Sequence, residues 1–173
     1  MTSILKVTEI QDPANSNAAL TIDSSGRVSF PQIPCACVTL TTSNTQDTSN
    51  PYTITNADIL FDKVTINQGS VYDSSNGRFT APITGIYEVA YSFLKDDDSG
   101  GNVTYVRVRK NDSDYTEAGG TLYDYASNAY SAMSMKLLIN LNASQYISFR
   151  MVSGAIHLNS DGQYHSVVFK LVG

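Results

Sequence analysis

The sequence predicts an all-β fold, a two-sheet antiparallel sandwich. About eight to ten short runs alternate apolar and polar residues with a period of two, and Gly-, Asn- and Asp-rich turns separate them. No run shows the 3.6-residue stripe of an amphipathic helix. With 173 residues, the chain has room for one domain with a sizeable core and a short appendage. This pattern is typical of a jelly roll.

The first 33 residues differ from the rest of the chain. Residues 4–10 predict a short strand, Pro13 interrupts the polar stretch that follows, and residues 19–30 predict a hairpin that turns at the sequence DSSG. Residues 31–34 read PQIP and predict a stiff linker. A segment this small cannot hold a core alone, so we expect residues 1–33 to be a β anchoring segment that packs on another chain, on the knob or on a larger assembly.

Residues 34–173 predict the sandwich itself. The expected strands and hairpins, in chain order, cover residues 37–42, 59–66, 71–79, 85–93, 103–110, 132–141, 146–152 and 165–172. A long polar loop, 43–56, and a polar, Tyr-rich stretch, 111–131, connect some of them. The strands at 132–141 and 165–172 carry apolar residues on both faces, for example Leu137 and Leu138, or Val167 and Val168. Such strands need a partner on both faces.

Charge and hydropathy exclude two classes of partner. The net charge is -5, and Arg107, Arg109 and Lys110 form the only tight basic cluster, so we expect no nucleic-acid binding. No run of roughly 18 apolar residues occurs, so we expect no membrane insertion. The N-terminus lacks a secretory signal pattern. This favours a protein that is assembled in a host cytoplasm, released by lysis and exposed on a virus particle.

One segment carries a family resemblance. Residues 59–93 resemble the signature region of the complement 1q/tumour necrosis factor family of globular heads, through Tyr72, Asp73, Gly77, Phe79, Ala81, Pro82, Gly85 and Tyr87. Residues 34–42, 131–154 and 165–173 resemble the family's first, late and closing strands. The physical reading of these residues is structural: the glycines and Pro82 shape turns, and Phe79 and Tyr87 fill the core. The resemblance implies a homotrimer and leaves the ligand open.

A second resemblance concerns residues 1–33. The run ILKVTEIQ followed by NAALTIDSSGRV is similar to the leader of structural proteins of tailed phages, notably those of cyanobacteria. It implies that this segment attaches to capsid or tail proteins.

The candidate metal ligands each have a structural alternative. Asp96, Asp97 and Asp98 form a carboxylate cluster that suits calcium, an ion that some family members carry, or they form a solvated loop tip. Cys35 and Cys37 lie on one face of a strand. They could bind a metal together with His157 and His165 from the chains of a trimer, or they are two small residues at an interface or a core edge. His165 is in phase with Val167 and Phe169, which predicts a buried, hydrogen-bonded side chain. We expect no other cofactor.

The Tyr-rich stretch offers a candidate recognition surface, with Tyr115, Tyr123, Tyr125 and Tyr130. Exposed tyrosines often bind sugars and proteins. Alternatively, these rings cover the sandwich edge or a subunit seam.

These observations lead to a phage virion structural protein as the first expectation. It would be a trimeric capsid-decoration, head-fibre or tail-fibre knob that cements the shell or binds a host-surface glycan or protein. The alternative is a cell-surface adhesion or ligand-type module. A glycan-cleaving enzyme is a more distant alternative. The sequence has no Gly-x-Ser-x-Gly motif and no recognisable nucleophile–base pair, so we expect no catalytic residues.

Overall fold

The computed structural model describes residues 7–11, 18–30, 32–47, 49, 51–96, 103–124 and 130–173. The chain divides into two compact units, Met1–Ile33 and Pro34–Gly173. Within the described residues, every regular element is a β-strand, and no helix long and apolar enough to cross a membrane occurs. The strands are β1 (Glu9–Gln11), β2 (Ala18–Ile22), β3 (Val28–Ser29), β4 (Cys35–Thr39), β5 (Ala57–Asp58), β6 (Lys63–Gln68), β7 (Tyr72–Asp73), β8 (Arg78–Thr80), β9 (Gly85–Leu94), β10 (Thr104–Lys110), β11 (Ser113–Asp114), β12 (Thr121–Asp124), β13 (Ala132–Leu141), β14 (Tyr146–Ser153) and β15 (Ser166–Leu171).

The N-terminal unit is a small antiparallel sheet in the order β1-β2-β3. The predicted hairpin is present, with Ile22 paired to Val28. Its turn is closed by Asp23, whose Oδ1 accepts hydrogen bonds from the backbone amides of Ser25 at 2.8 Å and Arg27 at 2.9 Å. Of the strand predicted at residues 4–10, only the end lies among the described residues, and β1 continues it to Gln11.

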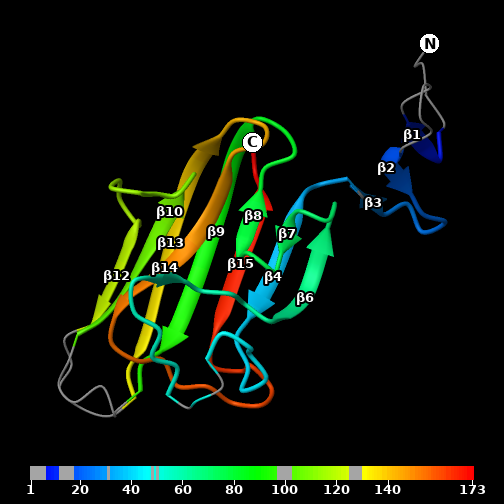
Figure 1. Ribbon diagram of the computed structural model, residues 1–173. Coiled ribbons are helices and arrows are strands. Elements are labelled where there is room, and N and C mark those ends of the chain that lie inside the picture. Colours follow the sequence, from blue (N-terminus) through cyan, green and yellow to red (C-terminus); the bar gives the residue numbers. More distant parts are fainter. Residues whose placement is uncertain are drawn as a thin grey trace. The chain divides into compact units, whose positions relative to one another are not determined.

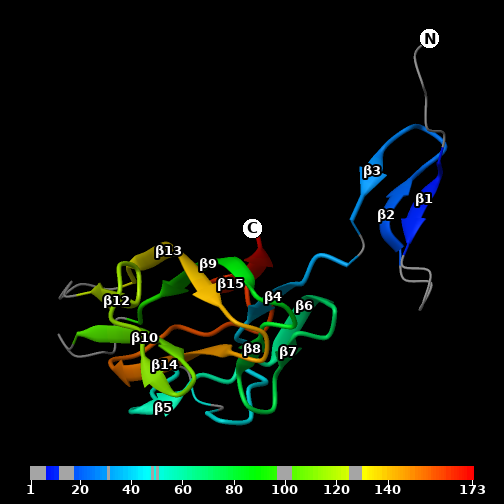
Figure 2. The ribbon, with the colours of Figure 1, turned by 90° about the horizontal axis from the view of Figure 1, so that it is seen from above.

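The larger unit is a sandwich of two antiparallel sheets, which confirms the predicted fold class (Figure 1). The first sheet, here called the β9 sheet, has the order β13-β9-β15-β4-β6. The second, here called the β10 sheet, has the order β11-β10-β14-β8-β7, with β12 also paired to β10 and β5 to β14. The view from above shows the two sheets as stacked layers (Figure 2).

Alternating side chains fill the space between the layers. On β9, the side chains of Tyr87, Val89, Tyr91 and Phe93 point inward and are at most 3% exposed. Phe149 of β14 lies at the centre of the aromatic core, and its ring centroid is 4.9 Å from that of Tyr91. The period-two pattern therefore identified the buried face of both strands.

The β7–β8 hairpin shows the structural role of the first signature residues. Tyr72 pairs with Phe79 across the hairpin, and Asp73 accepts a hydrogen bond from the Ser75 amide at 2.9 Å. Gly77 has a φ of +69°, and a Cβ atom there would lie 2.6 Å from the carbonyl oxygen of Ile59. A residue with a side chain would therefore be strained in this turn and would also collide with the backbone beside it.

The remaining signature residues lead from this hairpin into β9. Phe79 and Tyr87 are fully buried, with ring centroids 5.6 Å apart. Pro82 lies in the bend between β8 and β9. A Cβ atom on Gly85 would lie 2.6 Å from the carbonyl oxygen of Gly173, so the start of β9 depends on a close backbone approach.

The strand predicted at residues 59–66 is only half right. The strand β6 begins at Lys63, while the preceding residues run without strand pairing. Ile59 and Phe61 are buried, and their amides donate to the Phe149 carbonyl at 2.7 Å and to the Tyr72 hydroxyl at 3.2 Å. Hydrogen bonds to distant parts of the chain thus replace the strand pairing that the alternation of apolar and polar residues predicted for residues 59–62.

Two short strands lie in the stretch 111–131, for which the sequence indicated only polarity and tyrosines. β11 and β12 pair with successive parts of the same edge of β10. Each is too short for a period-two pattern to be visible in the sequence.

Candidate functional site

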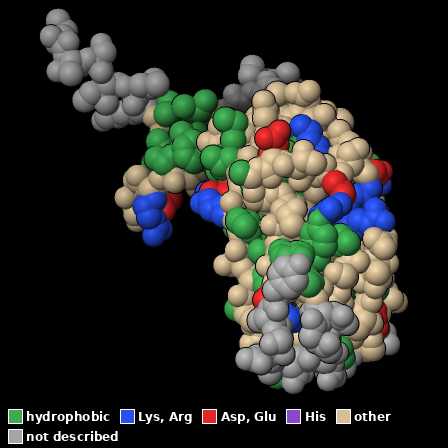
Figure 3. Space-filling view, turned by 90° about the vertical axis from the view of Figure 1, so that its left-hand side faces the viewer, with side chains coloured by type: hydrophobic (Ala, Val, Ile, Leu, Met, Phe, Trp, Pro, Cys, Tyr) green, Lys and Arg blue, Asp and Glu red, His purple; other side chains and the backbone are tan. Residues whose placement is uncertain are grey.

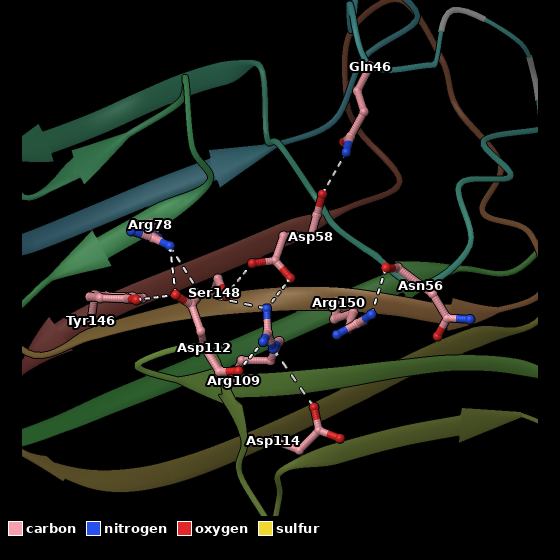
Figure 4. Close-up of polar contacts among 10 residues, drawn as sticks. All are labelled: Gln46, Asn56, Asp58, Arg78, Arg109, Asp112, Asp114, Tyr146, Ser148 and Arg150. Atoms are coloured by element: carbon pink, nitrogen blue, oxygen red, sulfur yellow. Dashed lines mark hydrogen bonds and ion pairs between the residues drawn. The ribbon is translucent and has the colours of Figure 1, made fainter.

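Four of the chain's five arginines lie in the β10 sheet, namely Arg78, Arg107, Arg109 and Arg150. They come from β8, β10 and β14. Figure 4 shows three of them, Arg78, Arg109 and Arg150, with aspartates from β5 and from the β10–β11 segment nearby. Because Arg107 and Arg109 alternate with buried valines along β10, their side chains lie on the outward face of the sheet.

Arg109 is the centre of this network. Its Nη1 lies 2.8 Å from Oδ1 of Asp58, whose other oxygen accepts a hydrogen bond from the Ser148 hydroxyl at 3.0 Å. Its other guanidinium nitrogen, Nη2, donates to the backbone carbonyl of Asp112, and Nε lies 3.9 Å from Asp114. The Arg109 side chain is only 13% exposed, so the surrounding oxygens compensate a largely desolvated charge.

Arg78 forms a second centre next to it. Its Nη2 lies 3.0 Å from both carboxylate oxygens of Asp112, and its guanidinium stacks 4.1 Å from the ring centroid of Tyr146. The Tyr146 hydroxyl donates to Asp112 at 2.6 Å. This hydrogen bond and the charges of Arg78 and Arg109 lower the pKa of the Asp112 carboxyl.

The network is best understood as a set of side-chain contacts that hold neighbouring strands together. The guanidinium groups of Arg78, Arg107 and Arg109 already face carboxylates, and Arg150 donates to the Asn56 carbonyl at 2.7 Å. The contacts join β5, β8, β10 and β14, and the hydroxyls of Ser148 and Tyr146 take part as hydrogen-bond donors to carboxylates. The basic cluster at Arg107 and Arg109 therefore has a structural explanation.

The outward face of the β9 sheet is different, because exposed apolar side chains lie on it. Leu138 on β13 is 59% exposed, Ile66 on β6 is 51% exposed and Ile86 on β9 is 45% exposed. Leu137, the neighbour of Leu138, is 4% exposed in the core. β13 is therefore apolar on both faces, as its sequence predicted.

A groove of about 510 Å³ runs along the edge of the sandwich between β12 and β13. Its apolar lining includes Leu122, Tyr123, Met133 and Met135, and Tyr123 is 46% exposed. Figure 3 shows hydrophobic side chains gathered on this side of the molecule, with Lys, Arg and acidic side chains beside them. The sandwich thus exposes a second apolar area, distinct from the face of the β9 sheet.

The predicted tyrosine surface is divided by the structure. Tyr115 is partly buried and packs against the core, while Tyr123 lines the edge groove. Tyr130 is 49% exposed and contacts the ring of His157. Tyr125 lies outside the described residues. The three described tyrosines therefore lie in different surroundings, and the recognition surface stays a prediction.

Only one of the three predicted carboxylates, Asp96, lies among the described residues. Asp97 and Asp98 lie outside the described residues, but Asp96 is only 3% exposed and its Oδ2 is 2.6 Å from Nδ1 of His157. Lys95 is also buried, and it forms a β-bridge with Ile156 just beyond the end of β9. Asp96 thus belongs to the folded end of the sandwich, not to a solvated loop tip, and calcium binding stays a prediction.

The cysteines lie as the sequence predicted, on one face of β4. Cys35 and Cys37 are half-buried free thiols, and Ala36 between them is in the core. Within the described ranges, no group of three or more His, Cys, Asp or Glu side chains is placed to hold a metal ion.

Comparison with known families decides the affiliation of the sandwich. The family described as C1q domain matches residues 41–169. The chain belongs to the C1q domain family. Its C1q domain is 29% identical over 103 residues to complement C1q tumor necrosis factor-related protein 3 of Mus musculus and of Homo sapiens, over 59% of this chain and 39% of the relative. The chain thus spans about two fifths of the length of these curated relatives.

Solved structures show the same fold at low sequence identity. The globular domain of zebrafish complement 1qA superposes with a TM-score of 0.56 at 13% identity, over 79% of this chain and 94% of that one. The TNF protein Eiger of S. frugiperda gives a TM-score of 0.62 at 9% identity, over 82% and 94%. Murine APRIL gives 0.60 at 12% identity, over 81% and 99%. C1q and TNF domains form trimers.

The pair of Asp96 and His157 was not predicted from the sequence. The two residues lie in segments far apart in the chain, and His157 was considered from the sequence only as a possible metal ligand beside the cysteines. His165 did carry a signal, since it follows the period of β15, and it is 3% exposed as predicted. Period-two patterning can place a residue on a face but cannot pair residues between loops.

Proposed function

We propose that this C1q domain is a homotrimeric recognition module of the ligand type that binds a partner and catalyses no reaction. The affiliation with the C1q domain family is the observation that carries the proposal, because its relatives are complement C1q-related proteins. These relatives favour the ligand-type module over the virion knob that the N-terminal residues led us to expect.

The two exposed apolar areas support the assembly. A threefold axis cannot bring a surface patch onto itself, so each subunit in a cyclic trimer must present two different patches. The outward face of the β9 sheet offers Leu138 and Ile66, and the groove between β12 and β13 offers Tyr123 and Met135. Burial of both patches against neighbouring copies would remove exposed apolar surface from water.

Sedimentation equilibrium of the full chain tests the assembly. We expect about three times the chain mass of 18.8 kDa. Leu138→Asp places a charge in the proposed interface and should yield a folded monomer, with an unchanged β-type circular dichroism spectrum. Ile83→Asp is the matched control, since Ile83 is 50% exposed but lies outside both patches. A wild-type chain that sediments as a monomer would contradict the proposal.

The N-terminal unit supports a second candidate role, in which residues 1–33 anchor the knob to the capsid or tail of a phage. This small sheet exposes Ile10, Val28 and Phe30 to about half of their full area, at 49%, 51% and 53%. Such side chains on so small a unit favour a partner. Mass spectrometry should detect the chain in purified phage particles whose genome encodes it. A chain found only outside purified particles would exclude this role and leave the ligand-type module intact.

A further inference from the structure

One cluster of side chains is explained neither by the core nor by the proposed trimer. Tyr130 precedes β13, Tyr164 precedes β15, and His157 lies between β14 and β15. The imidazole lies between the two phenol rings, with centroids 4.8 Å from Tyr130 and 5.4 Å from Tyr164. Tyr130 is 49% exposed and Tyr164 43% exposed, so both rings are accessible from solvent.

His157 is held in one orientation by the folded protein beneath it. Its Nδ1 donates to the carboxylate of Asp96, 2.6 Å away, so in the neutral ring Nε2 keeps its lone pair. Its backbone amide donates to the Leu94 carbonyl at 2.9 Å. Its backbone carbonyl accepts a hydrogen bond from Nε2 of the buried His165 at 2.6 Å. Side chain and backbone are therefore both fixed.

The buried Asp96 carboxylate is not explained by the stability of the fold. Asp96 is 3% exposed, and a buried carboxylate is usually no more stabilising than an apolar residue of the same size. What the carboxylate provides is an imidazole of fixed tautomer and orientation next to the surface, where the His157 side chain is 22% exposed. Fixing a polar side chain from below is how binding sites are preorganised.

The exposed groups indicate the class of ligand. Two tyrosine rings offer apolar faces for stacking, and their hydroxyls and an imidazole offer directional hydrogen bonds. The adjoining residues 159–163 read NSDGQ and are polar. The Asp96 carboxylate is buried and hydrogen-bonded to His157, so it does not face solvent at this site, and the chain as a whole is acidic. This combination suits a neutral, polyhydroxylated ring that has one apolar face.

We propose that Tyr130, His157 and Tyr164 form a binding site for a neutral saccharide at this end of the sandwich. A sugar ring would stack on Tyr164 or Tyr130, and its hydroxyl groups would donate to Nε2 of His157. The inference rests on the proposed recognition role, because three copies in a trimer would strengthen a weak single site.

A glycan array and saturation-transfer NMR with methyl hexopyranosides test the site in the full chain. We expect the wild-type protein to bind neutral glycans. Tyr164→Ala should weaken binding at least tenfold, while Tyr164→Phe, which keeps the stacking face, should retain most of it. Tyr146→Ala removes a tyrosine from the β10 sheet and is the matched control, with unchanged binding expected.

Three outcomes would overturn the inference. The first is a wild-type trimer that binds no neutral glycan or methyl glycoside. The second is glycan binding that Tyr164→Ala leaves unchanged. The third is binding restricted to acidic glycans and abolished by Arg150→Ala, which would place the site on the β10 sheet. Sedimentation of the same samples keeps this test separate from that of the trimer, because a trimer without sugar binding refutes the saccharide site alone.

Discussion

At the scale of single residues, Gly77 shows how one position controls a turn. Gly77→Ala should lower the free energy of unfolding by about 2–4 kcal/mol, because it adds both a positive-φ penalty and a collision with the Ile59 carbonyl. Gly69→Ala is the matched control: Gly69 has a φ of +82°, but its nearest neighbour would be an ordinary contact at 3.5 Å. Urea unfolding at fixed protein concentration measures both. Equal losses would show that the close approach contributes nothing.

His165 makes the stability of the sandwich depend on pH. Burial lowers the pKa of His165 to about 4, whereas the unfolded chain takes up the proton near pH 6.5. Stability that is present above pH 6.5 should therefore fall as the pH drops from about 6.5 to 4, by up to ~1.4 kcal/mol per pH unit.

The variant His165→Gln isolates this contribution. It should be less stable at pH 7, because it loses hydrogen bonds to Leu94 and His157, but its urea midpoint should change less between pH 6.5 and 4.5. Parallel pH curves for the two proteins would assign the acid sensitivity to groups other than His165.

At the scale of elements, the arginine network ties β5 and β8 to β10 and β14. Two of its ion pairs differ in exposure: Arg109–Asp58 at 13% and 21%, and Arg78–Asp112 at 35% and 49%. Double-mutant cycles with Arg→Gln and Asp→Asn should give a coupling of about 1–3 kcal/mol for the first pair and under ~1 kcal/mol for the second. Equal couplings would indicate that burial does not decide their strength.

The strands also differ in how well the sequence predicted them. Long alternating strands such as β9 and β14 were recognisable, because their inward residues form an unbroken period of two. The second half of the strand predicted at residues 59–66 forms part of β6. The first half forms hydrogen bonds to Phe149 and Tyr72 instead, and no local sequence pattern predicts such contacts. The pair of Asp96 and His157 escaped prediction because the fold alone brings the two side chains together.

At the scale of the whole molecule, the two apolar patches make a prediction about mixtures. Leu138→Asp damages the face of the β9 sheet and leaves the edge groove intact, whereas Tyr123→Asp does the reverse. Each variant alone should be monomeric, but a mixture should form a heterodimer through the one undamaged pair of patches. Sedimentation velocity of the mixture detects it. If the mixture sediments like the separate variants, the face-to-groove contact is wrong.

The pairing of β4 with β15 has a consequence for how the protein is made. β15 lies between β9 and β4, and Cys35 near the start of the sandwich pairs with Lys170 near its end. During synthesis, β4 and β9 therefore each keep one unpaired edge until β15 has left the ribosome. Such distant pairing slows folding and leaves strands open to aggregation. Chains truncated before β15 should accumulate as insoluble material, because β15 is the strand that completes the β9 sheet.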